Sequence, residues 1–184
     1  MYDVRKIQEN VIWKAVKEQS NEETATEIVY GHGEEAREEN NPDWVKSTMS
    51  RLEEAFPTEK IRQIRRNCQC GYGMDEREEL VRALFIGATS MEEFADSPKA
   101  REAGLFCRDG ILHLQFLFCP CPMVAEVDVL KTDTWCQCTT GYSKVLFEKV
   151  FGCEVEVELL QSIKMGQDSC LMKIIPLAEI WSKK

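Results

Sequence analysis

The residues of this sequence best suited to chemistry are three pairs of cysteines, each pair separated by a single residue. The pairs are Cys68 and Cys70, Cys119 and Cys121, and Cys136 and Cys138. In an extended or turn conformation, the side chains of residues i and i+2 point to the same side. Two thiolates of one pair can therefore bind one metal ion at Zn–S distances of about 2.3 Å. The spacing is not the Cys-x2-Cys of ordinary zinc ribbons, so it indicates a thiophilic metal without specifying the kind of site.

The surroundings of the pairs also favour ligating or reactive thiols. The second pair lies in "FCPCP", where the prolines cannot donate hydrogen bonds to a sheet. The third pair falls at the predicted start of a helix, a position that lowers the pKa of a thiol. The alternative is that the cysteines fill the core, because an unligated cysteine packs as a small hydrophobe. We expect that structural role for Cys107 and Cys153, which are flanked by strand residues.

The composition limits the class of protein. The chain has 184 residues, of which 43% are hydrophobic, and this is enough for one sizeable core. Nine cysteines without an apolar signal segment indicate a cytoplasmic protein with metal or redox chemistry rather than a disulfide framework. No apolar run approaches the roughly 20 residues of a membrane helix. A membrane is therefore not an expected partner. The net charge of −9 would repel phosphate groups, so nucleic acid is not an expected partner either.

The first half of the chain has the periodicity of helices. Apolar residues recur at spacings of three and four within residues 2–19. Further helices are predicted around Ala25 to Val29, over residues 43–55 and after Pro57. Another helix is predicted after Asp75, which we expect to cap its N-terminus. The later stretch "SMEE" has the spacing of a capping box.

The second half changes to the period of strands. "LFCRDGILHLQF" contains two strands around an Asp-Gly turn at residues 109–110, which is the pattern of a β-hairpin. A helix is predicted over residues 134–152, and "CEVEVELL" and "SCLMKIIP" are predicted to form a second hairpin. The sequence therefore predicts an α+β fold. A helical part over residues 1–104 would pack on a hairpin-helix-hairpin domain with an antiparallel sheet over residues 105–184.

From Trp135 onward, the chain resembles the 4-vinyl reductase-like small-molecule-binding domains. The resemblance is carried by Trp135, Gly141, Tyr142, the helix after them, "EVEVE" from residue 154 and "MGQDSC" from residue 165. Members of that family are thought to hold a metal, zinc being the expected one, with cysteines near these motifs. The resemblance implies Cys170 as a ligand, whereas Ser162 stands where the family has a further cysteine.

The layout of the whole chain is similar to that of L-2-amino-thiazoline-4-carboxylic acid hydrolase-like proteins. They also combine an N-terminal helical part with a cysteine-bearing hairpin, helix and hairpin, but the likeness is architectural and carries no catalytic residue over. A cysteine nucleophile needs a base, and the histidines are His32, in an acidic segment, and His113, in a predicted strand. Glu126 and Asp128 follow the second pair and could serve as a fourth ligand or as a proton carrier.

These observations combine into one candidate site. Zinc or another thiophilic metal is the expected ion, and Cys68 and Cys70 are further contributors. The predicted metal ligands are Cys119, Cys121, Cys136, Cys138 and Cys170. The predicted ligand-binding residues are Trp135, Tyr142, Phe118 and His113. The aromatic members of this set could line a pocket for an apolar molecule.

The favoured function is a cytoplasmic, sensor-type protein that binds a small-molecule ligand or a metal at a cysteine-lined site. The alternative is a hydrolase that acts on a small thiazoline-like or amide substrate through a cysteine thiolate or a metal-bound water. For partners, we expect a small molecule and leave open whether the chain forms a homodimer.

Overall fold

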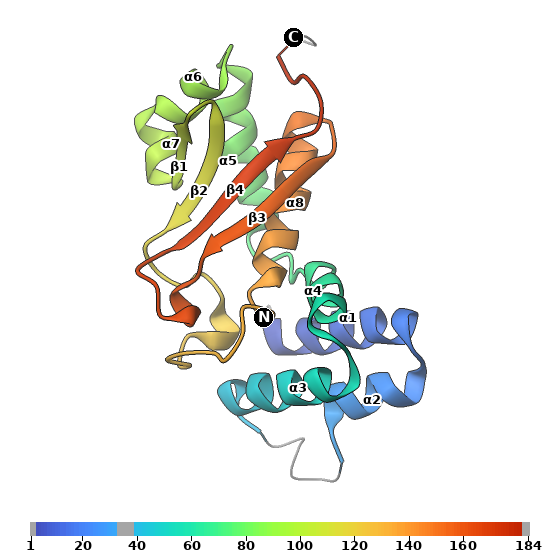
Figure 1. The fold of residues 1–184 in the computed structure, drawn as a ribbon. Coiled ribbons are helices and arrows are strands. Elements are labelled where there is room, and N and C mark those ends of the chain that lie inside the picture. Colours follow the sequence, from blue (N-terminus) through green and yellow to red (C-terminus); the bar gives the residue numbers. More distant parts are fainter. Residues whose placement is uncertain (1–2, 33–38, 182–184) are drawn as a thin grey trace. The chain divides into compact units, whose positions relative to one another are not determined.

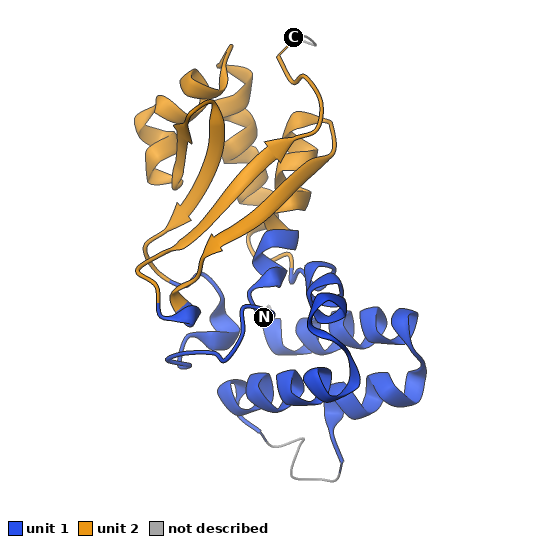
Figure 2. Ribbon diagram, viewed as in Figure 1, with its two compact units in different colours: residues 1–70, 119–141, 164–166 blue, residues 71–118, 142–163, 167–184 orange. Residues whose placement is uncertain are grey.

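A computed structural model describes residues 3–32 and 39–181 and confirms the α+β class (Figure 1). Most helices precede a four-stranded antiparallel sheet, which is formed by the C-terminal half of the chain. The chain forms two compact units, and each is assembled from three segments (Figure 2). Unit 1 comprises residues 1–70, 119–141 and 164–166, and unit 2 comprises residues 71–118, 142–163 and 167–184.

This division differs from the boundary expected after residue 104. Helices α5 (Met74–Ile86), α6 (Met91–Asp96) and α7 (Pro98–Glu102) belong to unit 2 together with the sheet. Residues 119–141, which were expected in the C-terminal domain, belong to unit 1. The reason is packing: the apolar side chains of the three helices share a core with the strands, whereas those of residues 119–141 enter the core of the N-terminal helices.

The N-terminal part of unit 1 consists of helices whose starts follow from the sequence. They are α1 (Val4–Gln19), α2 (Glu22–Tyr30), α3 (Asn41–Ala55) and α4 (Thr58–Arg66). The side chains of Asp3, Asn21 and Asn40 accept hydrogen bonds from backbone amides in the first turns of α1, α2 and α3. Trp44 and Leu52 of α3 are fully buried in the core that these helices share. None of the helices in the described ranges has the length and apolar character that a membrane crossing requires.

Residues 119–141 return to this core much later in the sequence. They contain a short 3-10 helix, Pro122–Val124, and the first turn of α8 (Gln137–Phe151), which continues into unit 2. Met123 and Trp135 are buried among the side chains of the N-terminal helices. This segment therefore brings the second and third cysteine pairs into the same unit as the first pair.

Gly141 allows the first turn of α8 to approach the end of α4. A Cβ atom at this position would lie 1.8 Å from the carbonyl oxygen of Arg66, so no larger residue fits without movement of the backbone. Polar contacts fix the same junction. Arg66 Nε donates to Gln137 Oε1 at 3.2 Å, Gln137 Nε2 donates to Asp133 Oδ2 at 2.9 Å, and Arg62 forms an ion pair with Asp133 at 3.0 Å.

The sheet of unit 2 has the strand order β1-β2-β4-β3, and every neighbouring pair is antiparallel. The strands are β1 (Leu105–Arg108), β2 (Ile111–Phe116), β3 (Val155–Gln161) and β4 (Cys170–Pro176). The predicted turn between β1 and β2 is confirmed, because Asp109 and Gly110 both have positive φ, 54° and 75°. Both predicted hairpins are thus present, and they join through the pairing of β2 with β4.

One face of the sheet is covered by α5 and α8 (Figure 1). Leu112 of β2 and Ile174 of β4 are fully buried on this face. Phe85 of α5 packs against Phe151 of α8 with ring centroids 5.1 Å apart. The alternation of apolar residues along the strands therefore marks the covered face, as the sequence predicts.

The helix starts of unit 2 differ in one respect from the sequence prediction. Helix α5 begins after Gly73, which has a φ of 66°, and Asp75 lies in its first turn instead of capping it. A carboxylate in that turn still interacts favourably with the helix dipole. The predicted cap of α6 is confirmed, because Ser90 Oγ accepts a hydrogen bond from the Glu93 amide at 3.2 Å.

Candidate functional site

All three Cys-x-Cys pairs lie in unit 1, although they are far apart in the sequence. The first pair follows the end of α4, the second precedes the 3-10 helix, and the third spans the start of α8. Cys68 is fully buried and the other five cysteines are half-buried. The fold therefore places all three Cys-x-Cys pairs in one unit.

Four of these side chains interact and are called the thiol cluster from here on: Cys68, Cys70, Cys121 and Cys138. Burial raises the pKa of Cys138 to about 12, and the neighbouring thiols of Cys121, Cys70 and Cys68 contribute to the rise. Cys138 Sγ donates to the carbonyl oxygen of Cys68 at 3.2 Å. The cluster thus links the end of α4, the segment before the 3-10 helix and the start of α8.

Arg65 lies beside the thiol cluster and is fully buried. Its Nη1 donates to Gln8 Oε1 at 3.0 Å, its Nη2 donates to the carbonyl oxygen of Trp135 at 3.3 Å, and its guanidinium stacks 3.9 Å above the Trp135 ring. Gln8 Nε2 in turn donates to the carbonyl oxygen of Cys68 at 2.9 Å. Within the described part of the chain, Arg65 forms no ion pair with a carboxylate. Such a buried cation is costly unless other negative charge is nearby.

Two buried donors next to the cluster lack a hydrogen-bond acceptor among the described residues. They are Arg65 Nε and Trp135 Nε1. Each belongs to a side chain that lowers the pKa of a cluster thiol: Arg65 acts on Cys68, and Trp135 acts on Cys121. A thiolate is a much better acceptor than a thiol. Ionisation of the cluster would therefore satisfy both donors and balance the buried guanidinium.

Three of the cluster thiols, Cys68, Cys121 and Cys138, are protonated at neutral pH in this arrangement. Burial raises the pKa of Cys68 to about 11, against the charge of Arg65, and burial also raises the pKa of Cys121. The expectation that a helix start lowers the pKa of Cys138 is wrong. Burial and the neighbouring thiols outweigh the positive charge of Arg65, which lowers the pKa of Cys138.

The remaining predicted metal ligands have different surroundings. Cys119 acts electrostatically on Cys121 at the edge of the cluster, and Cys136 packs against the core of unit 1. Cys170 belongs to unit 2, where it is buried opposite Phe116 in the pairing of β2 with β4. Within residues 3–32 and 39–181, no three Cys, His, Asp or Glu side chains converge closely enough to hold a metal ion as they stand.

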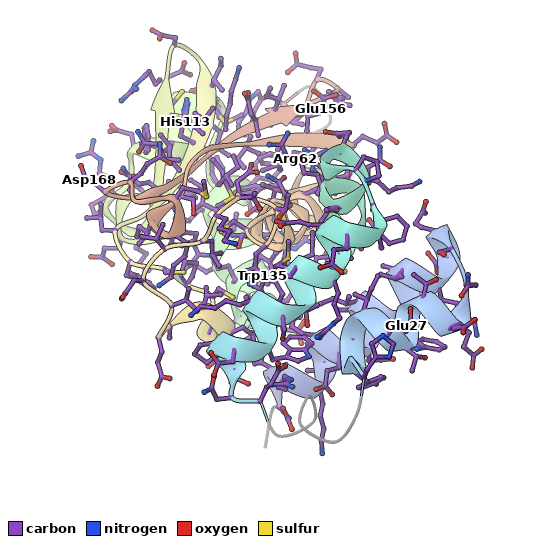
Figure 3. The ribbon with its side chains drawn as sticks, turned by 60° about the horizontal axis from the view of Figure 1, so that its bottom comes forward. Glu27, Arg62, His113, Trp135, Glu156 and Asp168 are labelled. Atoms are coloured by element: carbon purple, nitrogen blue, oxygen red, sulfur yellow. The ribbon has the colours of Figure 1, made fainter. Side chains whose placement is uncertain are left out.

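The predicted ligand-binding residues divide between the units. Trp135, labelled in Figure 3, is buried in unit 1, and its ring forms a T-shaped pair with that of Trp44 at a centroid distance of 6.0 Å. Tyr142, Phe118 and His113 belong to unit 2. Their positions there differ: Tyr142 lies on α8, and Phe118 is exposed beyond the end of β2.

His113 is buried in the sheet. Its ring stacks on Phe106 of β1 at 5.0 Å, and Nδ1 lies 3.1 Å from the carbonyl oxygen of Ile111. The strand predicted around His113 is therefore present. The other histidine, His32, is 80% exposed beside Glu27, 3.5 Å away. Glu126 and Asp128 are also exposed.

The sequence analysis did not single out Arg65 and Gln8, two polar residues that are buried beside the thiols. A signal for Arg65 was present. In α4 and just after it, Ile61, Ile64 and Cys68 recur at the spacing of one helical face, and Arg65 occupies a position of that same face. A charged residue in an apolar stripe indicates a buried cation in need of a partner.

Fold and site together define an α+β protein with a thiol-rich helical unit and a separate antiparallel sheet unit. The chain belongs to a family of unknown function (DUF6144), whose family model matches residues 1–181. Searches of curated proteins and of solved structures gave no match. The resemblance to 4-vinyl reductase-like domains and to thiazoline-carboxylate hydrolase-like proteins stays a prediction.

Proposed function

We propose that unit 1 binds a thiophilic metal ion, with zinc as the expected one, through the thiol cluster. The observation that carries this proposal is the buried Arg65, which lies beside the cluster thiols without a carboxylate partner among the described residues. A divalent ion bound by four thiolates is an anion overall. Arg65 would neutralise part of that charge, and the anion would in turn offset the cost of burying the guanidinium.

The donor set supports the same class of ion. Thiolate ligands select zinc, monovalent copper and iron–sulfur clusters over magnesium, calcium and manganese, which prefer oxygen. The orphan donors Arg65 Nε and Trp135 Nε1 fit an outer shell that donates hydrogen bonds to coordinated sulfur. A reducing compartment, such as the cytoplasm, would keep the thiols available for binding.

Metal binding at the thiol cluster changes the conformation of unit 1. The cluster thiols come from three segments, and in the described residues they do not yet form a coordination shell. Closing them around an ion would draw these segments together and release their protons. A protein whose conformation changes when it binds a metal ion can act as a metal sensor, which is the sensor-type function expected from the sequence.

The hydrolase alternative has less support from the geometry. A nucleophilic cysteine requires a thiolate near neutral pH, whereas burial raises the pKa of Cys68 to about 11 and that of Cys138 to about 12. The histidine of unit 1 is the exposed His32. A metal-bound water would depend on the same metal site, so hydrolysis is secondary to binding.

The proposal is tested by zinc content after dialysis, measured by elemental analysis on protein made without a metal-binding tag. We expect about one zinc per chain for the unaltered protein and for Cys153→Ser, a half-buried cysteine of unit 2 that serves as the matched control. Cys138→Ser and Cys70→Ser should each lose most of the metal while keeping their helical circular dichroism. Retention of full zinc content by both variants, or zinc loss from Cys153→Ser alone, would contradict the proposal.

A further inference from the structure

Unit 1 also contains a cavity of about 220 Å³, bounded by α3 and residues 129–132, with Trp135 as one wall. Neither the thiol cluster nor the proposed metal site occupies it. An engineered apolar cavity of about 150 Å³ accommodates benzene. The cavity therefore has room for a six-carbon body together with one small polar group.

The inner wall of the cavity is apolar. Met49, Leu130 and Trp135 line it and are all buried, with exposed fractions of 7%, 9% and 2%. All three also belong to the hydrophobic core of unit 1, so they are held by packing on their other sides. An apolar ligand would meet a preformed surface here and would not have to order it.

The rim of the cavity carries excess positive charge. Lys46 and Lys131 line it, and neither forms an ion pair with a residue that the structure describes. The acidic side chain of the lining, Glu53, accepts a hydrogen bond from the Thr132 hydroxyl at 3.3 Å. In a chain of net charge −9, two lysines at one cavity mouth that have no ion-pair partner among residues 3–32 and 39–181 mark a place where an anion is attracted.

We propose that this cavity binds a small organic monocarboxylate with an apolar body of about six carbons. The carboxylate would face the ammonium groups of Lys46 and Lys131, and the hydrocarbon would lie against Met49, Leu130 and Trp135. Pockets of this kind combine an apolar wall with a few polar groups that orient the ligand. The site goes beyond the proposed metal function and does not depend on it.

The test uses cyclohexanecarboxylate as the probe and cyclohexanecarboxamide and acetate as controls, added to the full-length, metal-free protein. The amide keeps the shape without the charge, and acetate keeps the charge without the ring. Binding is followed by NMR at the Trp135 indole N–H and the Met49 methyl group. We expect cyclohexanecarboxylate to shift both signals and to bind at least about tenfold more tightly than either control, because only it uses both parts of the lining.

Substitutions distinguish the contribution of the rim lysines to binding from that of the apolar wall. Lys131→Gln and Lys46→Gln should each weaken cyclohexanecarboxylate at least about fivefold and leave the amide unchanged, because they remove charge alone. Lys14→Gln is the matched control, since Lys14 is exposed on α1 and does not line the cavity. The proposal is overturned if the probe leaves both signals unmoved, if carboxylate and amide bind equally, or if Lys14→Gln weakens binding as much as the rim variants do.

Discussion

Zinc affinity should rise steeply with pH, because three of the four thiols proposed to bind the metal, Cys68, Cys121 and Cys138, are protonated at neutral pH. Burial raises the pKa of Cys68 to about 11 and that of Cys138 to about 12, and it also raises the pKa of Cys121. Between about pH 6 and pH 8, each of these thiols must release one proton for every metal ion bound. Three such thiols make the apparent association constant increase at least about 1000-fold per pH unit.

The raised pKa values also lower the affinity at any one pH. Relative to the ordinary thiol value of 9.0, Cys68 and Cys138 are shifted by about 2 and about 3 pH units. At about 1.4 kcal/mol per unit, each of these shifts costs the binding reaction a few kcal/mol, and part of the Cys138 shift is its interaction with Cys68, so the two costs are not independent. A site formed by ordinary exposed thiols would not have this cost, so the pH dependence and the moderate affinity at pH 7 should occur together.

The assay is competition of the protein with a chromophoric zinc chelator at a series of pH values, under anaerobic conditions with reduced thiols. Calorimetry in buffers of different ionisation enthalpy counts the released protons independently. Cys153→Ser should show the same slope as the unaltered protein, since this cysteine lies in unit 2. A slope of one proton or fewer per zinc would refute the reasoning, because it would mean that the ligands are not buried thiols.

Further predictions follow from single residues. Gly141→Ala should lower the free energy of unfolding by about 1–3 kcal/mol, measured by urea denaturation, because its Cβ would collide with the Arg66 carbonyl. Gly87→Ala should change this free energy little, because its Cβ would make only ordinary contacts of 3.9 and 4.0 Å with backbone oxygens. Arg65→Met should weaken zinc at least about tenfold in the chelator assay, while Arg65→Lys keeps the charge and most of the affinity. The metal-free protein should lose stability as pH rises from about 9 to about 12, because Cys68 and Cys138 ionise at lower pH in the unfolded chain than in the folded protein. Chemical denaturation at each pH measures this loss.

The elements of this fold were largely predictable because each obeys local rules. Helical periodicity predicted α1. The Asp-Gly step predicted the turn between β1 and β2, where Asp109 and Gly110 have the required positive φ. The grouping of the elements was not predictable in the same way. Residues 119–141 belong with the N-terminal helices because Trp135 packs against Trp44, and no local pattern encodes that long-range contact.

The candidate site was predictable only in its residue types. The Cys-x-Cys spacing identified the thiols, but the meeting of Cys68 with Cys138 depends on the close approach that Gly141 permits between α8 and α4. The pKa expectation failed because the local effect of a helix start was weighed without the burial that only the tertiary structure supplies. The burial of Arg65, in contrast, could have been predicted, because its place in the apolar stripe of α4 is visible in the sequence.

The most direct test of the central claim is X-ray absorption spectroscopy at the zinc edge of the protein loaded with one equivalent of zinc. We expect a first shell made of sulfur alone at about 2.3 Å, which is lost in the Cys138→Ser variant and preserved in Cys153→Ser. A first shell of nitrogen and oxygen at about 2.0–2.1 Å, or a protein that takes up no zinc, would contradict it.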